Sequence, residues 1–218
     1  VILANMLAVS VGTLFIAVST FDEAGIAAAL YYLMHSTLAA AALFLIVDQV
    51  RARRGNSALA LQAPMPGGGL VAALFFVAAI AMAGMPPLSG FIGKLLVLDA
   101  IRSADWWIWG WAFILITSLV ALVGFARAGS ALFWKPHDAT APDDDPFQGA
   151  PGATSNLGLA ALAGILALIV ALTVAAGPAT RYTQAAAGQL FDRQVYIHAI
   201  LGTPDERAAR RAAEAAAA

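Results

Sequence analysis

An apolar stretch interrupted by proline, residues 83–94, constrains the fold of this chain more than any other feature. The surrounding sequence would otherwise predict one long membrane helix. Pro86 and Pro87 cannot donate backbone hydrogen bonds, and Gly84 and Gly90 loosen the backbone on either side. The helix is therefore predicted to break within this segment.

The predicted break places a lysine inside the membrane region. We expect the helix to stop at about Met85 and to restart near Ser89 or Gly90, so Lys94 lies about one turn into the new half-helix, followed by Leu95, Leu96 and Val97. A charged amine in apolar surroundings is costly and marks a functional site by default. A broken membrane helix is tolerated only where protein or a water-filled cavity satisfies its freed backbone groups. The break and the lysine together predict an ion path.

Composition sets the class of protein. The 218 residues are 61% hydrophobic and 11% charged, whereas a soluble chain carries about 25% charged residues. We therefore predict an all-α, polytopic transmembrane helix bundle. The net charge of −1 gives no reason to expect nucleic acid, and the absence of cysteine together with three scattered histidines argues against a metal site or cofactor. No nucleophile or phosphate-binding motif is present, so translocation without covalent chemistry is expected rather than an enzyme.

The chain divides into apolar spans joined by polar segments. The transmembrane bundle is predicted over residues 1–178, with spans at about 1–20, 24–50, 70–84, 90–101, 106–134 and 157–176. We interpret residues 51–54 as a basic interfacial loop, 135–156 as a polar loop, and Gly177-Pro178 as the end of the last span. An amphipathic helix on the interface or on a partner is expected at 179–202, and a solvated tail at 203–218.

The start of the chain and the start of the 106–134 span each carry a further signal. Val1 already lies in an apolar run without the charged region of a signal peptide, so we interpret the chain as the C-terminal part of a longer protein. Tryptophans favour the headgroup level of a membrane, and four of them gather where the 106–134 span begins: Trp106, Trp107, Trp109 and Trp111.

Three segments resemble the proton-translocating antiporter family. They are residues 30–45, with the run Tyr31-Tyr32-Leu33-Met34-His35-Ser36-Thr37, the broken segment 83–94, and residues 196–202 near the end of the chain. The middle segment is typical of the whole family, which includes Mrp/Pha-type cation/proton antiporters and membrane subunits of respiratory NADH:quinone oxidoreductase. The other two segments most resemble the D subunit of the Mrp/Pha antiporters.

This resemblance implies a fold and a set of functional residues. The chain would form the C-terminal part of a fourteen-helix antiporter-like fold with inverted repeats, in a complex with other antiporter subunits. Lys94 and His35 would carry protons, and Tyr32, Ser36 and Thr37 are possible water ligands. Many relatives place a lysine five positions after His35, where this chain has Ala40. Water and nearby hydroxyl groups would then have to bridge the gap.

The physical chemistry of Lys94 and His35 is compatible with proton transfer. Burial disfavours the ammonium form of Lys94, and so does the positive end of the half-helix dipole. Both effects would prepare this side chain to release and regain a proton. Imidazole exchanges protons near neutral pH, which suits His35 for a relay. Lipid-headgroup contact for Lys94 and simple core packing for His35 are the structural alternatives.

Other charged residues are secondary candidates. Asp48 and Asp99 could be exit-site carboxylates, or they could pair with Arg51 and Arg102 at the membrane interface. Arg127 could pair within the bundle or reach the interface.

The resemblance thus implies a multi-pass subunit of an antiporter in a bacterial plasma membrane, which would move protons inward against Na⁺ or K⁺ export. The alternatives are a subunit of a redox-driven proton pump and a non-conducting scaffold subunit. Loop charges and the resemblance predict opposite membrane orientations, and both remain open.

Overall fold

The computed structural model describes residues 2–55, 65, 67–134, 156–192, 197–200 and 202–217. Within this part of the chain every regular element is a helix, as the composition predicted. Most of the predicted polar loop, residues 135–155, lies outside it. The elements are α1 (Ile2–Val18), α2 (Glu23–Arg54), α3 (Gly68–Ala83), α4 (Ser89–Ala100), the 3-10 helix η1 (Ile101–Ser103), α5 (Trp107–Gly129), the π-helical turn η2 (Ser130–Trp134), α6 (Asn156–Val174), α7 (Ala176–Phe191) and α9 (Pro204–Ala217).

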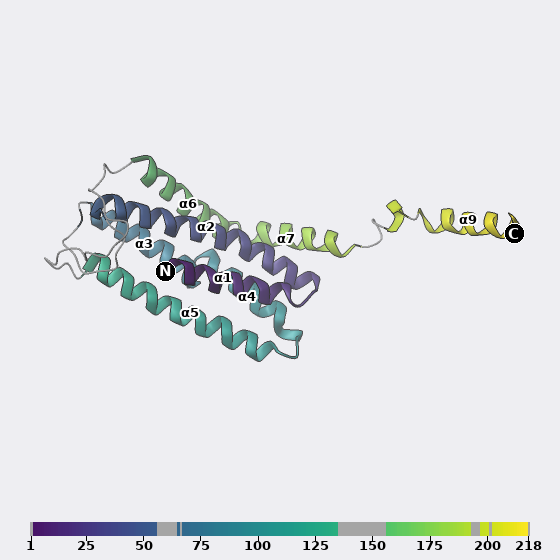
Figure 1. Cartoon of the computed structure of the whole chain (residues 1–218), viewed down its shortest axis with the longest axis horizontal. Coiled ribbons are helices and arrows are strands. Elements are labelled where there is room, and N and C mark those ends of the chain that lie inside the picture. Colours follow the sequence, from purple (N-terminus) through teal and green to yellow (C-terminus); the bar gives the residue numbers. More distant parts are fainter. Residues whose placement is uncertain are drawn as a thin grey trace.

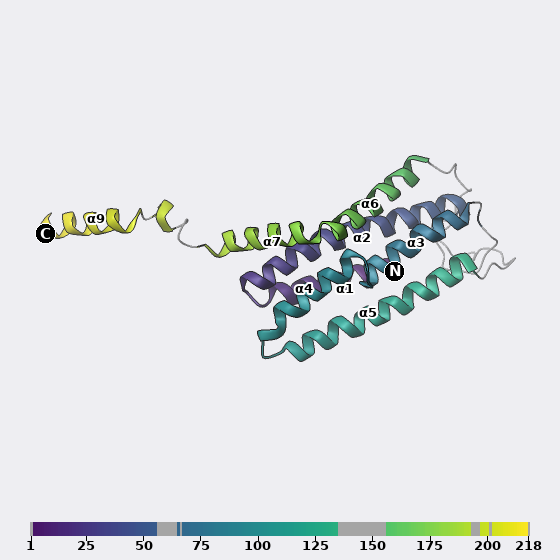
Figure 2. The same cartoon turned by 180° about the vertical axis from the view of Figure 1, so that it is seen from behind.

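The long helix α2 is the central element of the bundle. It contacts α1, α3, α4, α6 and α7, and it runs through the middle of the bundle in two opposite views (Figure 1, Figure 2). Its start is fixed by Asp22, whose carboxylate accepts a hydrogen bond from the Gly25 N–H at 2.7 Å. Its end is fixed by Gly55, which has a φ of 75° and donates its N–H to the Arg51 carbonyl at 2.8 Å.

The basic cluster at residues 51–54 belongs to α2, so its prediction as a loop was wrong. Arg51, Arg53 and Arg54 form the last turn of the helix. Cations are favoured there because the helix dipole is negative at its C-terminal end. Arg53 also donates to the side-chain oxygen of the buried Gln49 at 2.8 Å, and Arg54 donates to the carbonyl of Leu132 in η2 at 2.5 Å. These side-chain bonds help to continue the helix past its apolar part.

The segment after α6 also differs from the prediction. We expected Gly177-Pro178 to end the last span, but α6 ends at Val174 and α7 begins at Ala176, after a single turn residue. Pro178 therefore lies in the first turn of α7, where proline is tolerated because no intrahelical N–H is needed. The helix α7 packs on α2 and buries Thr183 and Ala187. Beyond α7 the chain leaves the bundle, and α9 lies well away from it (Figure 1).

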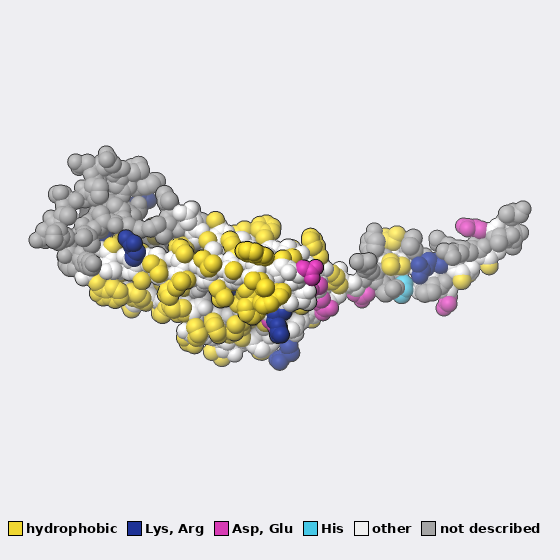
Figure 3. All heavy atoms as spheres, turned by 90° about the horizontal axis from the view of Figure 1, so that it is seen from below, with side chains coloured by type: hydrophobic (Ala, Val, Ile, Leu, Met, Phe, Trp, Pro, Cys, Tyr) yellow, Lys and Arg dark blue, Asp and Glu magenta, His cyan; other side chains and the backbone are white. Residues whose placement is uncertain are grey.

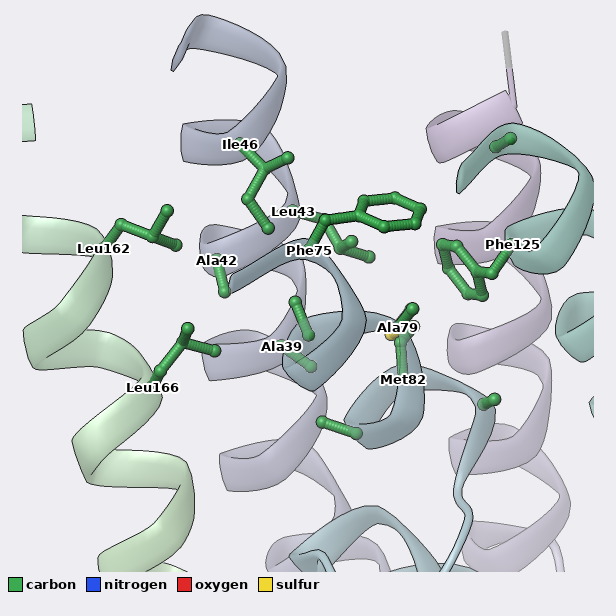
Figure 4. Packing of buried hydrophobic residues seen from close by; sticks show 14 of the residues in the cluster. Ala39, Ala42, Leu43, Ile46, Phe75, Ala79, Met82, Phe125, Leu162 and Leu166 are labelled. Atoms are coloured by element: carbon green, nitrogen blue, oxygen red, sulfur yellow. The ribbon is translucent and has the colours of Figure 1, made fainter. Parts of the chain in front are cut away.

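Small residues of α2 allow its neighbours to approach closely. Ala39 and Ala42 have no exposed surface, and they lie in one apolar cluster with residues of α3, α5 and α6. Figure 4 shows this cluster, with Leu162 and Leu166 of α6 on one side of α2 and Phe75 of α3 on the other. In membrane helices such close packing replaces the hydrophobic effect as the source of association.

The outer surface is apolar along the bundle. Three helical stretches have the length and apolar composition needed to cross a membrane, namely Glu23–Arg54, Trp107–Trp134 and Asn156–Val174. The face seen in Figure 3 is mostly hydrophobic, with charged side chains gathered toward the ends of the bundle. Much of this surface comes from α5, which exposes Ile108, Phe113, Leu115, Ile116, Leu119, Val120 and Val123. The architecture is that of a membrane helix bundle.

The packing of α2 generates a stability prediction. We expect Ala39→Leu to destabilise the purified protein by about 1–3 kcal/mol, because a larger side chain has no room in this cluster. Ala161→Leu on the exposed face of α6 is the matched control and should leave stability unchanged. Thermal unfolding in detergent, followed by size-exclusion chromatography, measures both. Equal melting behaviour of the two variants would contradict the packing.

Candidate functional site

The helix interruption leaves backbone carbonyls at the end of α3 that need hydrogen-bond donors. Gly84 adopts a φ of 77°, which allows its N–H to reach the carbonyls of Ile80 and Ala81 at 3.1 Å each. The N–H of Met85 reaches the Ile80 carbonyl as well, also at 3.1 Å. This arrangement ends the helix within its own chain. The Pro86-Pro87 peptide bond is cis, and α4 begins at Ser89.

The side chain of Lys94 satisfies another carbonyl at this helix end. It is half-buried and folds back from α4 across the break, and its Nζ donates to the Ala83 carbonyl at 2.7 Å. A second bond runs from Nζ to the hydroxyl of Ser118 on α5 at 2.8 Å. Gly84 makes this path possible, since a Cβ there would lie 2.7 Å from Lys94 Cδ and 2.9 Å from Nζ. Lys94 therefore joins both half-helices to α5.

This geometry changes the electrostatic interpretation of Lys94. We expected its amine beside the positive N-terminal end of α4. Side chains in helices point toward the N-terminus, so the four-carbon chain of Lys94 instead carries Nζ to the Ala83 carbonyl, at the negative end of the α3 dipole. The carbonyl and the Ser118 hydroxyl are both positioned to hold a positive charge, whereas burial opposes it.

His35 lies on the other side of the interruption. Its side chain is 1% exposed, and its Nδ1 makes a hydrogen bond of 2.9 Å with the hydroxyl of Ser89, the first residue of α4. A Cβ on Gly90 would lie 2.7 Å from His35 Nε2 and would overlap the Ala81 carbonyl. The imidazole therefore packs directly against the break, with α4 and the end of α3 both in contact range.

A row of buried hydroxyl groups continues from His35 toward α1. The rings of Tyr32 and His35 are 6.1 Å apart between centroids. The hydroxyl of Ser10 on α1 donates to the Tyr32 hydroxyl at 3.2 Å, and both side chains are less than 5% exposed. Thr13 is buried beside them and donates to the Val9 carbonyl at 3.2 Å. Polar side chains thus extend across the bundle at the level of the break.

The remaining predicted residues lie elsewhere. Ser36 and Thr37 both bond the Leu33 carbonyl of their own helix, at 3.2 Å and 2.8 Å. Asp48 and Arg127 are exposed near the C-terminal ends of α2 and α5. The exposed carboxylate of Asp99 pairs with Arg102 at 3.4 Å, at the far end of α4. Within the described residues, no group of three histidine or acidic side chains could hold a metal ion.

Sequence reasoning did not identify Ser89 and Ser118 as site residues. Ser89 carries a usable signal, because the helix is predicted to restart near this residue after the two prolines. Ser118 lies in an apolar span, and only the packing of α5 on α3 and α4 brings it to Lys94. Ser10 and Thr13 look in the sequence like ordinary contacts between helices.

The interrupted helix, with Lys94 of α4 and His35 of α2 packed against the break, lies in a polytopic bundle of apolar helices, so the class is a helical membrane protein. The family comparison agrees with this class. Residues 6–121, which include His35, the break and Lys94, match the family model described as NADH:quinone oxidoreductase/Mrp antiporter, TM. The chain belongs to this family, and the sequence-based resemblance is confirmed.

Curated relatives carry the names of antiporter subunits. The chain is 29% identical to the probable K(+)/H(+) antiporter D subunit of Rhizobium meliloti, over 90% of this chain and 40% of that protein. It is 30% identical to the Na(+)/H(+) antiporter D subunit of Alkalihalophilus pseudofirmus, with coverage of 88% and 37%. For the Na(+)/H(+) antiporter D subunit of Bacillus subtilis the identity is 31%, with coverage of 88% and 38%. The chain thus spans about two fifths of the length of these relatives.

The close packing at the break generates a prediction for Gly90. We expect Gly90→Ala to disturb the site, because the added Cβ meets the Ala81 carbonyl and the His35 ring at once. The cost should be about 1–3 kcal/mol of stability, measured by thermal unfolding in detergent. Gly69→Ala at the start of α3 is the control, since a Cβ there meets nothing within 4 Å. A Gly90 variant as stable as this control would show that the break tolerates an added methyl group.

Proposed function

We propose that this chain is part of the proton-translocating subunit of a multisubunit Na⁺(K⁺)/H⁺ antiporter, and that protons pass the helix break through Lys94, His35 and water. The observation that carries this proposal is the placement of Lys94, whose ammonium bridges the carbonyl end of α3 and α5 inside a membrane helix bundle. The names of the antiporter relatives support the choice of antiport.

The proposed resting position of the proton is on Lys94. The Ser118 hydroxyl donates its own proton to the Ile114 carbonyl at 2.6 Å, so it offers only a lone pair to the lysine. The Ala83 carbonyl is likewise an acceptor only. Both partners favour a lysine that donates, and neither can return a proton to it. Release of the proton therefore requires Lys94 to leave this position or to meet water.

The proposed next station is His35. A lysine side chain is flexible, and that of Lys94 lies directly over Gly84. Because Gly84 has no Cβ, the Lys94 side chain can change its conformation there without a steric clash. His35 is held by Ser89, close to the same break, and it can accept a proton on one ring nitrogen while it releases one from the other. With Ala40 in place of a relay lysine, water has to complete the path between the two groups.

A second candidate function comes from the family itself, whose description also names NADH:quinone oxidoreductase. There the same proton path would be driven by distant electron transfer rather than by a cation gradient. Proton movement in vesicles driven by Na⁺ or K⁺ alone would favour antiport, and movement seen only during NADH oxidation would favour the redox-driven pump. In either case we propose a bacterial plasma membrane location and other membrane subunits as partners.

The proposal predicts that Lys94 is indispensable for transport. Lys94→Ala should abolish cation-driven proton movement in everted membrane vesicles while the complex still assembles, because no other described residue places an amine at the break. Lys94→Glu keeps a titratable group of opposite charge and should retain part of the activity if proton exchange matters more than charge.

His35→Gln should lower proton uptake by the reconstituted complex, since glutamine keeps a hydrogen bond but cannot relay a proton.

The control for these variants is Arg181→Gln, which removes an exposed cation from α7. It should transport as the unmodified protein does. Normal transport by an assembled Lys94→Ala complex would reject the relay and favour the scaffold alternative.

The contact between Lys94 and α5 gives a separate prediction. Ser118→Ala removes a hydrogen bond to a charged group, which is worth about 1.5–3 kcal/mol, so the transport rate should change by roughly tenfold to a hundredfold. The matched control is Thr117→Ala, because the hydroxyl of this neighbouring residue bonds only carbonyls of its own helix, at 2.7 Å to Phe113 and 3.2 Å to Ile114. Rates measured in the same vesicles compare the two. Identical rates would show that Ser118 does not position Lys94.

A further inference from the structure

A groove of about 640 Å³ lies between α4 and the first half of α5, away from the helix break. Its apolar wall is formed by Leu95 and Leu98 of α4 and by Leu115 of α5. Leu95 and Leu115 are about half exposed, at 47% and 53%. The groove therefore opens to the outside of the bundle, on a surface that continues into the apolar face of α5.

One end of the groove is polar and carries both signs of charge. Asp99 and Arg102 line it, with their carboxylate and guanidinium 3.4 Å apart. Their side chains are 75% and 69% exposed. An exposed pair of this kind contributes little to stability, so either group can exchange its partner for an ion of matching charge at small cost. The groove thus offers one cation and one anion side by side.

Two indole rings fix the depth of this end in the membrane. Trp107 and Trp111 line the groove and meet edge to face, with centroids 5.5 Å apart and an angle of 81° between the rings. The indole N–H of Trp111 donates to the Leu98 carbonyl at 2.9 Å, which anchors the ring against α4. Because tryptophan side chains favour the boundary between lipid tails and headgroups, the charged end of the groove lies at headgroup level.

We propose that this groove is a binding site for a phospholipid whose headgroup carries a primary ammonium, as phosphatidylethanolamine does. Arg102 binds the lipid phosphate, Asp99 accepts hydrogen bonds from the ammonium, and an acyl chain lies along Leu95, Leu98 and Leu115. The site and the headgroup each carry one positive and one negative charge, so each charge of the headgroup meets a charge of opposite sign. Lys94 is not among the residues that line this groove, and the inference does not depend on the proposed transport activity.

The headgroup chemistry decides between lipids, because an acyl chain has similar surroundings in the groove and in the bulk bilayer. The phosphate of an anionic lipid such as phosphatidylglycerol can bind Arg102, but its headgroup has no cation to pair with Asp99. The quaternary ammonium of phosphatidylcholine carries the right charge but has no N–H to donate to the carboxylate. Only the primary ammonium offers both the charge and the hydrogen bonds that Asp99 can accept.

The test is lipid retention by the full chain in its purified complex. The complex is incubated in detergent with equal amounts of phosphatidylethanolamine, phosphatidylcholine and phosphatidylglycerol, and the bound lipids are counted by native mass spectrometry. We expect preferential retention of phosphatidylethanolamine, reduced at least threefold in both Asp99→Asn and Arg102→Gln. Both substitutions are at exposed positions and nearly conserve side-chain volume, so folding should be unaffected.

Two controls remove the same charges elsewhere. Asp48→Asn on α2 and Arg181→Gln on α7 are both at exposed positions and should retain phosphatidylethanolamine as the unmodified complex does. Leu95→Phe, which narrows the groove without changing charge, should reduce retention as well. Unchanged retention in the Asp99 and Arg102 variants overturns the proposal, as would follow if another subunit covered the groove. Equal retention of all three lipids also overturns it.

Discussion

The hydrogen bond from Lys94 to the Ala83 carbonyl is the interaction on which the centre of this structure depends. A membrane helix that stops within the bilayer exposes carbonyls that no water is available to satisfy. Here the N–H groups of Gly84 and Met85 and the amine of Lys94 donate hydrogen bonds to carbonyls at the end of α3. Since Lys94 belongs to α4 and the carbonyl to α3, one bond both caps the first half-helix and holds the second against it.

Glycines allow the rest of the site to assemble around this bond. Gly84 leaves room for the Lys94 chain, and Gly90 leaves room for His35 beside the Ala81 carbonyl. A Cβ on Gly93 would lie 3.0 Å from the Tyr32 ring, so α2 and α4 approach closely there too. The buried polar row of α2 can therefore lie directly on the break. The small residues set the distances at which the functional side chains meet.

The helix α4 connects two regions of different chemistry. Its first turns carry Ser89 and Lys94, which face α2, α3 and α5 inside the bundle. Its last turn carries Asp99, which faces outward beside tryptophans. A helix of 12 residues is too short to cross a bilayer alone. It reaches from the buried break to the exposed pair of Asp99 and Arg102, so the proposed lipid site lies on the same short helix that holds Lys94.

The sequence by itself determined the fold class and the position of the break, and it singled out Lys94 as a candidate site residue, because proline chemistry and a charge in an apolar run are local properties. It misplaced the ends of α2 and α6, since Arg53 and Arg54 are held by side-chain bonds and Pro178 is tolerated in a first turn. Only the tertiary structure decided that the amine of Lys94 turns back to α3 and meets Ser118, and that His35 bonds Ser89. These partners come from different helices, and their register depends on how small residues pack, which no local pattern encodes.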